Sequence, residues 1–195
     1  MDDLAEVRTG LTLRGSNATL FSSDAGPHYL RIGDLTANGI VHINMPDRIA
    51  LPPEVTEKYL LRKGDLVLAN RGSRLTAAVF EEDIETVACS QFYIIQIKGA
   101  AKVLPQFLSW FLNLEATTAS LHSLATGATI KSVPVGAVRS LLVPVPSLER
   151  QRQIVEFMKL WNLEKEILED LERLKAQLFQ HSLLHAASQD ARFRP

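Results

Sequence analysis

The segment around Gly72 carries side chains that could bind a phosphate or a base. They are those of Arg71, Ser73 and Arg74. They follow the short apolar run 66–69, which is typical of a buried strand. A turn at Gly72 would therefore hold both guanidinium groups at the end of a rigid element. Guanidinium groups bind phosphate oxygens and the acceptor edge of guanine through paired hydrogen bonds. This segment is one candidate binding site.

A second candidate segment is centred on Gly127. Thr126, Thr129 and Lys131 flank this glycine, so backbone amides, hydroxyl groups and a cation could together hold a phosphate. Further candidates in predicted polar loops and beside a hairpin turn are Arg14, Ser16, Asn17, Asn38 and His42. For each of these side chains the alternative is an exposed loop residue without a binding partner.

Motifs for catalysis or nucleotide binding are missing from the sequence. It contains no Gly-x-x-x-x-Gly-Lys, Gly-x-Gly-x-x-Gly or Gly-x-Ser-x-Gly pattern, no Glu-x-Lys, and no Asn/Asp-Pro-Pro-Tyr/Phe. His181 and His185 are one helical turn apart and could bind a metal, but no third ligand is near. The alternative is that both face solvent near a helix end. We therefore predict no catalytic residues, no metal site and no cofactor.

Composition and charge are those of an ordinary soluble globular protein. Of the 195 residues, 46% are apolar and 22% charged, and the net charge is −1. Residues 1–146 contain 13 Lys and Arg against 14 Asp and Glu, and the remainder contains 8 of each. Bulk charge thus gives no support for nucleic-acid binding, although it does not exclude a local basic patch.

The single cysteine and the N-terminal residues indicate the cellular compartment in which the protein is expected. Cys89 is the only cysteine, which excludes a disulfide framework and predicts a small buried apolar residue. Met1-Asp2-Asp3 is acidic where a signal peptide needs basic residues. No apolar run approaches the roughly 18 residues of a transmembrane helix. We therefore expect a cytoplasmic protein.

Short strands separated by turns are expected to position the candidate segments. The predicted strands are 29–32, 40–43, 66–69, 77–80, 86–88 and 92–97, with a short helical turn near 55–61. An apolar helix should begin at Pro105, and Leu121 and Leu124 either continue it or begin another. Residues 133–143 are predicted to be extended. The fold class is α+β: a compact β-rich domain over 1–146 with a helical wedge.

One long helix should follow this domain. Pro144 and Pro146 end the preceding strand, Ser147 can cap the helix, and Glu149 suits its first turn. Residues 148–184 contain no Gly or Pro, and 37 helical positions would extend about 55 Å. We assign 147–185 to the helix and expect 186–195 to form a flexible tail.

The apolar residues of this helix recur every 3.6 positions. They form a stripe of Leu160, Leu163, Ile167, Leu171, Leu174 and Leu178, with Ile154, Phe157, Met158 and Trp161 widening it near the start. The stripe either packs on its own domain or pairs with another long helix, and little of the chain remains to cover it. We expect pairing through Ile154, Phe157, Trp161, Leu163, Ile167, Leu171, Leu174 and Leu178.

Several motifs resemble a known family in their order. They are Leu-Ala-Glu-Val-Arg-Thr-Gly-Leu-Thr (4–12), Tyr-Leu-Arg-Ile-Gly-Asp-Leu (29–35), Lys-Gly-Asp-Leu-Val-Leu-Ala-Asn-Arg-Gly-Ser (63–73), Thr-Gly-Ala-Thr-Ile (126–130) and Val-Pro-Val-Pro-Ser-Leu-Glu-Arg-Gln-Arg-Gln-Ile-Val (143–155). Together they resemble the target-recognition domain and spacer helix of type I restriction–modification specificity (S) subunits. One departure is Arg150-Gln151, where the family often has Glu-Gln.

The resemblance implies a non-catalytic subunit that reads double-stranded DNA and assembles with methyltransferase (M) subunits, with a restriction (R) subunit joining for cleavage. Complete S subunits carry two recognition domains and two helices, so this chain resembles half of one. We expect a homodimer through antiparallel pairing of residues 154–184, and hence a split palindromic target. Two alternatives stay open: an interaction adaptor that dimerises through the helix without binding DNA, and an enzyme with an unrecognised site.

Overall fold

The computed structural model describes residues 1–13, 26–36, 39, 47–72, 75–127 and 131–190. The chain divides into two compact units, Met1–Arg152 and Gln153–Pro195. The expected strand 40–43 lies outside the described residues. The α+β class expected from the sequence is confirmed, with a sheet-containing unit and a long C-terminal helix.

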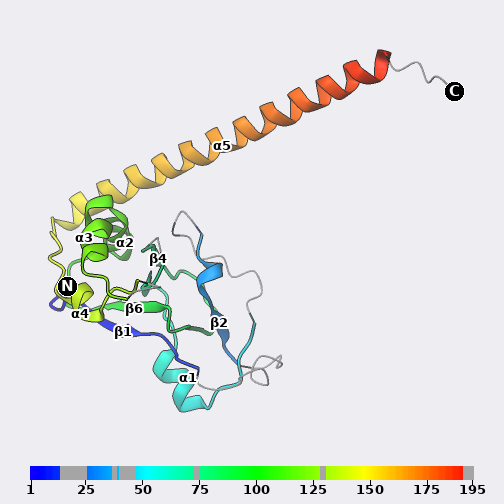
Figure 1. Cartoon of the computed structure of the whole chain (residues 1–195). Helices are drawn as coiled ribbons and strands as arrows, with labels where there is room; N and C mark the ends of the chain where they lie inside the picture. Colours follow the sequence, from blue (N-terminus) through cyan, green and yellow to red (C-terminus); the bar gives the residue numbers. More distant parts are fainter. Residues whose placement is uncertain (14–25, 37–38, 40–46, 73–74, 128–130, 191–195) are drawn as a thin grey trace. The chain divides into compact units, whose positions relative to one another are not determined.

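A four-stranded antiparallel sheet forms the centre of the first unit (Figure 1). Its strands are β1 (Ala5–Thr9), β6 (Phe92–Ile97), β3 (Leu66–Ala69) and β4 (Ala77–Val79), in that spatial order. Each residue of β3 is buried, as the uninterrupted apolar run predicts for a strand covered on both faces.

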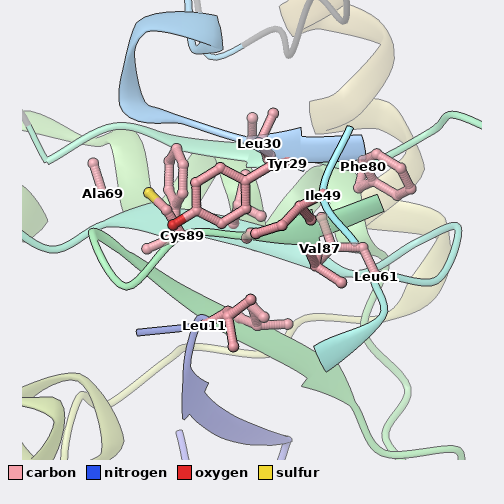
Figure 2. Packing of buried hydrophobic residues seen from close by; sticks show 14 residues of the cluster. Leu11, Tyr29, Leu30, Ile49, Leu61, Ala69, Phe80, Val87 and Cys89 are labelled. Atoms are coloured by element: carbon pink, nitrogen blue, oxygen red, sulfur yellow. The ribbon is translucent and has the colours of Figure 1, made fainter. Parts of the chain in front are cut away.

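A separate two-stranded sheet has parallel strands. It joins β2 (His28–Leu30) to β5 (Thr86–Ala88), with Tyr29 opposite Val87. Figure 2 shows the side chains of this pair within a buried apolar cluster. The cluster consists of Leu11, Tyr29, Leu30, Ile49, Leu61, Val67, Ala69, Ala78, Phe80, Val87, Ala88, Cys89, Phe92 and Ile94. Cys89 is buried there, as the sequence predicts.

Helices cover the strands of this unit. They are α1 (Pro53–Tyr59), α2 (Pro105–Asn113), α3 (Glu115–Ser123) and α4 (Val135–Arg139), with a 3-10 turn η2 at Ile32–Asp34. Proline occupies the first helical position of α1 and α2, where its missing amide hydrogen costs nothing. Leu121 belongs to the separate helix α3 and Leu124 follows its last residue, which settles the alternative left open by the sequence.

The expectation of extended structure throughout 133–143 is wrong, because α4 lies inside this segment. Pro134 precedes the helix with φ −63° and ψ 142°, and the amide of Ser140 closes it on the Gly136 carbonyl. Val135 and Val138 have β preference, but this is a weak local signal that tertiary packing overrides. Val138 is fully buried and supplies that packing.

The long helix α5 spans Leu148–Asp190, 43 residues. Its predicted start is correct, since the Ser147 hydroxyl accepts a hydrogen bond from the Arg150 amide at 3.3 Å. The helix continues beyond residue 185, so 186–190 are helical where a flexible tail was expected. No glycine or proline interrupts residues 186–190, and nothing in that sequence ends the helix.

Arg31 follows β2, and its guanidinium forms an ion pair with the Asp47 carboxylate at 2.6 Å. The Arg31 backbone amide donates to the Asp34 carboxylate at 2.7 Å. The same guanidinium lies 5.8 Å from the centre of the Tyr29 ring.

Candidate nucleic-acid interface

The two glycine-centred segments singled out in the sequence lie side by side at the end of β3. Arg71 forms an antiparallel bridge with Ser132, and the Gly72 amide donates to the Lys131 carbonyl at 3.4 Å. Sixty residues of chain separate the members of this contact. Arg71 and Lys131 are therefore neighbours, although each was predicted from its own motif.

Thr126 also forms an antiparallel bridge with Ser132. Its amide donates to the Ser132 carbonyl at 2.9 Å, and the Ser132 amide donates to the Thr126 carbonyl at 2.8 Å. Gly127 has φ +119° and Gly72 has φ +100°, a backbone region that side-chain-bearing residues rarely adopt. The glycines thus allow both chain segments to turn, and the side chains of Arg71 and Thr126 next to them are exposed.

Asn70 links the Gly72 segment to the segment around Ser132 through hydrogen bonds. Its side chain is 3% exposed and donates from Nδ2 to the Ser90 carbonyl at 2.9 Å. Its own carbonyl accepts the Val133 amide at 3.0 Å and the Ser132 hydroxyl at 3.3 Å. The Asn70 Oδ1 atom is buried and has no hydrogen-bond partner among the described residues. A buried polar residue with these partners fixes the geometry of the loops around it.

Tyr93 forms a second hydrogen bond to the segment that follows Lys131. Its hydroxyl donates to the Val133 carbonyl at 2.7 Å. Burial raises the pKa of the Tyr93 hydroxyl, while the positive charge of Arg71 opposes that shift. Tyr93 therefore stays protonated and able to donate at neutral pH. Neither Asn70 nor Tyr93 was among the predicted site residues; the signal available in the sequence was their position, in or at the end of a predicted buried strand.

The charged side chains at this place are available to a ligand. Arg71, Thr126 and Lys131 are exposed. Neither Arg71 nor Lys131 forms an ion pair with any residue that the structure describes. Exposed cations beside exposed backbone turns can contact phosphate groups or base edges. The other predicted binding residues lie outside the described part of the chain: Arg14, Ser16, Asn17, Asn38, His42, Ser73, Arg74 and Thr129.

The second unit carries the other candidate surface, the apolar stripe of α5. Every side chain from residue 163 to residue 188 is exposed. The six stripe residues are exposed by between 44% for Leu171 and 67% for Leu178. An uncovered apolar surface of this length is typical of an association site. Of the other expected pairing residues, Phe157 and Trp161 are exposed and Ile154 is half-buried.

Metal-binding groups and membrane-spanning helices are both absent from the part of the chain that the structure describes. This part contains no group of three or more His, Cys, Asp or Glu side chains placed to hold a metal ion. His181 and His185 both lie on α5 and are exposed. As for membranes, α5 is long but too polar to cross a bilayer, and no other helix of the described chain meets the length and hydropathy required.

Comparisons with known proteins identify the family to which the chain belongs. The family model for the type I restriction modification DNA specificity domain matches residues 1–173. The chain therefore belongs to the type I restriction–modification DNA specificity domain family. A comparison with curated proteins finds no match.

Three solved structures resemble the chain in fold. A type I restriction–modification S subunit from M. genitalium is 18% identical with a TM-score of 0.57, over 98% of this chain and 46% of that one. A structure solved to explain complex assembly and conformational transition of the type I R-M system is 14% identical with a TM-score of 0.61, over 96% and 42%. The HsdS subunit from Thermoanaerobacter tengcongensis is 14% identical with a TM-score of 0.54, over 86% and 37%. This chain thus spans less than half the length of each.

Proposed function

We propose that the chain is a non-catalytic, cytoplasmic DNA-recognition subunit of a type I restriction–modification system. Family membership supports the general role. The observation that supports the site assignment is the bridge between Arg71 and Ser132, because it joins the backbone segments that carry the exposed residues Arg71, Thr126 and Lys131. In this proposal Lys131 and Thr126 bind phosphate, and Arg71 contacts phosphate or guanine.

The other predicted binding residues are proposed contacts as well. Ser73, Arg74 and Thr129 adjoin Gly72 and Lys131 in the sequence, so we propose that they contact the same stretch of duplex. Arg14, Ser16, Asn17, Asn38 and His42 are further proposed contacts. No cofactor, metal or catalytic residue is assigned, because reading a sequence requires only hydrogen bonds and charge.

Binding of short duplexes over a salt series tests this site. Arg71→Ala with Lys131→Ala should weaken binding by roughly tenfold or more and reduce the salt slope by about one for each phosphate that the variant no longer binds. Lys63→Ala is a matched control, because Lys63 is an exposed cation that precedes β3 in the chain. Unchanged affinity of the double variant would move the reading surface elsewhere. Absence of any duplex binding by the wild-type chain at low salt would favour the adaptor alternative.

We further propose that two copies of the chain associate through the leucine stripe of α5, running antiparallel. An isolated helix gains little stability without packing of its apolar face, and this face is uncovered. Two identical readers related by a two-fold axis contact two identical half-sites in opposite orientation. The proposed target is therefore a split palindrome.

A second apolar face of α5 suits the methyltransferase subunits. It consists of Phe157, Trp161, Leu168, Phe179 and Leu183, each more than half exposed. At about 100° per residue, this face is centred roughly 110° around the helix from the leucine stripe. Phe157 and Trp161, initially expected in the dimer contact, are better placed here. A two-fold axis perpendicular to both helices brings the two aromatic faces onto one side of the pair, where M subunits could pack and an R subunit could join the complex.

A further inference from the structure

We propose that the two copies of α5 pair in one register, with the two-fold axis beside Asp170. This inference rests on the proposed homodimer and adds its register. In it, Leu178 packs between Leu160 and Leu163 of the partner subunit. Ile167 of the partner subunit packs between Leu171 and Leu174. The six stripe residues then form a continuous apolar seam with equal numbers of residues on each side of the axis.

Unpaired acidic residues beside the stripe point to this register. Four acids of α5 already form ion pairs within the chain: Glu156 with Lys159, Glu169 with Lys165, Asp170 with Arg173 and Glu172 with Lys175. Glu164 and Glu166 form none with the residues that the structure describes. They flank Lys165 in the middle of the helix, where a second copy would lie.

The spacing of the charged residues along α5 determines which of them can form ion pairs with the partner helix. Glu164 and Lys175 are eleven residues apart, which is three turns, so they lie on the same edge of the stripe. Glu166 and Arg173 are seven residues apart, which is two turns, and lie toward the opposite edge. In an antiparallel pair each edge of the stripe faces the same edge of the partner. An axis beside Asp170 therefore brings Glu164 to the partner's Lys175 and Glu166 to the partner's Arg173, twice each.

Sliding the helices by one heptad keeps apolar contacts but reverses this charge pattern. With the axis nearer Glu166, that carboxylate faces its own copy, and Lys159 faces the partner's Arg173. With the axis beside Arg173, that guanidinium faces its own copy and Lys175 faces the partner's Leu171. Like charges in direct opposition destabilise a helix pair. The register beside Asp170 opposes the two Asp170 carboxylates at the axis, but of these three registers it alone joins opposite charges on both edges, in four contacts.

Cysteine cross-linking in the full-length chain tests the register. Cys89 is buried, so the wild-type chain serves as the uncross-linked control. Asp170→Cys should form a disulfide with its own copy under mild oxidation. Glu164→Cys and Lys175→Cys should each fail to link alone, because their own copies would be about 15 to 18 Å apart. A mixture of these two variants should link as a heterodimer.

Other cross-linking patterns would overturn the register. Self-linking of Glu166→Cys or Arg173→Cys, without Asp170→Cys, would identify one of the heptad-shifted pairs. Self-linking at every position would indicate parallel helices. In these cases sedimentation would still show a dimer, so the proposed homodimer would stand and only the register would fail. A monomer at all concentrations would overturn both, while duplex binding by that monomer would leave the DNA-reading role intact.

A charge exchange provides an independent measurement. Glu164→Lys and Lys175→Glu should each weaken dimerisation by on the order of fivefold, because each creates two like-charge contacts. The double variant Glu164→Lys with Lys175→Glu should return the dissociation constant to near the wild-type value. Additive weakening in the double variant, in place of recovery, would show that the two residues do not meet across the helices.

Discussion

Asn70 and Gln151 are the two buried polar side chains that most directly link distant segments of the first unit. Asn70 joins the ends of β3 and the Lys131 segment beneath the candidate DNA-contacting residues. Gln151, fully buried in the first turn of α5, donates to the carbonyls of Lys102 and Pro146 and accepts the Leu104 amide. Both residues were visible in the sequence motifs, but single-sequence patterns do not reveal which polar residues are buried.

The residue that should be least replaceable in the first turn of α5 is Gln151. Gln151→Leu keeps a similar volume but leaves three backbone groups without partners, and each unsatisfied buried group costs about 1–3 kcal/mol. We expect the free energy of unfolding to fall by about 3 kcal/mol or more, measured by urea denaturation. The matched control is Gln180→Leu on the exposed part of the same helix, which should change stability little. Equal effects of the two variants would contradict this account.

Candidate contact residues were selected where a glycine marked a turn. The segment with Arg71 and the segment with Thr126 and Lys131 were selected independently, and the structure joins these two segments. Their proximity was not predictable, because the bridge between Arg71 and Ser132 joins segments far apart in the chain. Tyr93 was predicted within a strand, but its role beneath Val133 depends on that same long-range contact.

At the scale of elements, strongly patterned segments were predicted and weakly patterned ones were not. The apolar run of β3 and the glycine- and proline-free length of α5 gave correct elements. The five-residue helix α4 was missed, since one turn is too short to show a helical period. The parallel pairing of β2 with β5 was not predictable either, because each strand has three residues and their partners are distant.

The leucine stripe yields a prediction about α5 as an element. Leu171→Glu with Leu174→Glu places charges at the centre of the proposed seam, so sedimentation should show a monomer for the variant and a dimer for the wild-type chain. The fold of the first unit should be unaffected, because both side chains are already exposed in the single chain. The control is Ala176→Glu with Gln180→Glu, which adds the same charge on the opposite face of the helix. A dimer that survives the double glutamate substitution in the stripe would place the interface elsewhere.

At the scale of the whole molecule, a two-fold assembly predicts the form of its DNA target. Duplexes carrying two inverted copies of the recognised half-site should bind much more tightly than duplexes with one copy, because linked sites raise the effective concentration. The monomeric Leu171→Glu, Leu174→Glu variant should lose this advantage and bind both duplexes alike. Competition binding measures the ratio. Equal affinity of the wild-type chain for single and inverted half-sites would argue against a symmetric reader.

Polar side chains occupy both outer strands of the four-stranded sheet. On β4, the Asn113 side chain accepts the Ala77 amide and donates to the Ala77 carbonyl, each at 2.8 Å, and the Ser109 hydroxyl donates to the same carbonyl at 3.2 Å. On β1, the Arg139 guanidinium donates to the Val7 carbonyl at 2.7 Å. Exposed backbone groups on an outer strand otherwise recruit strands from other molecules and seed aggregation. With these positions taken, neighbouring copies have fewer free backbone groups through which to pair sheet to sheet, and the proposed association would be confined to α5.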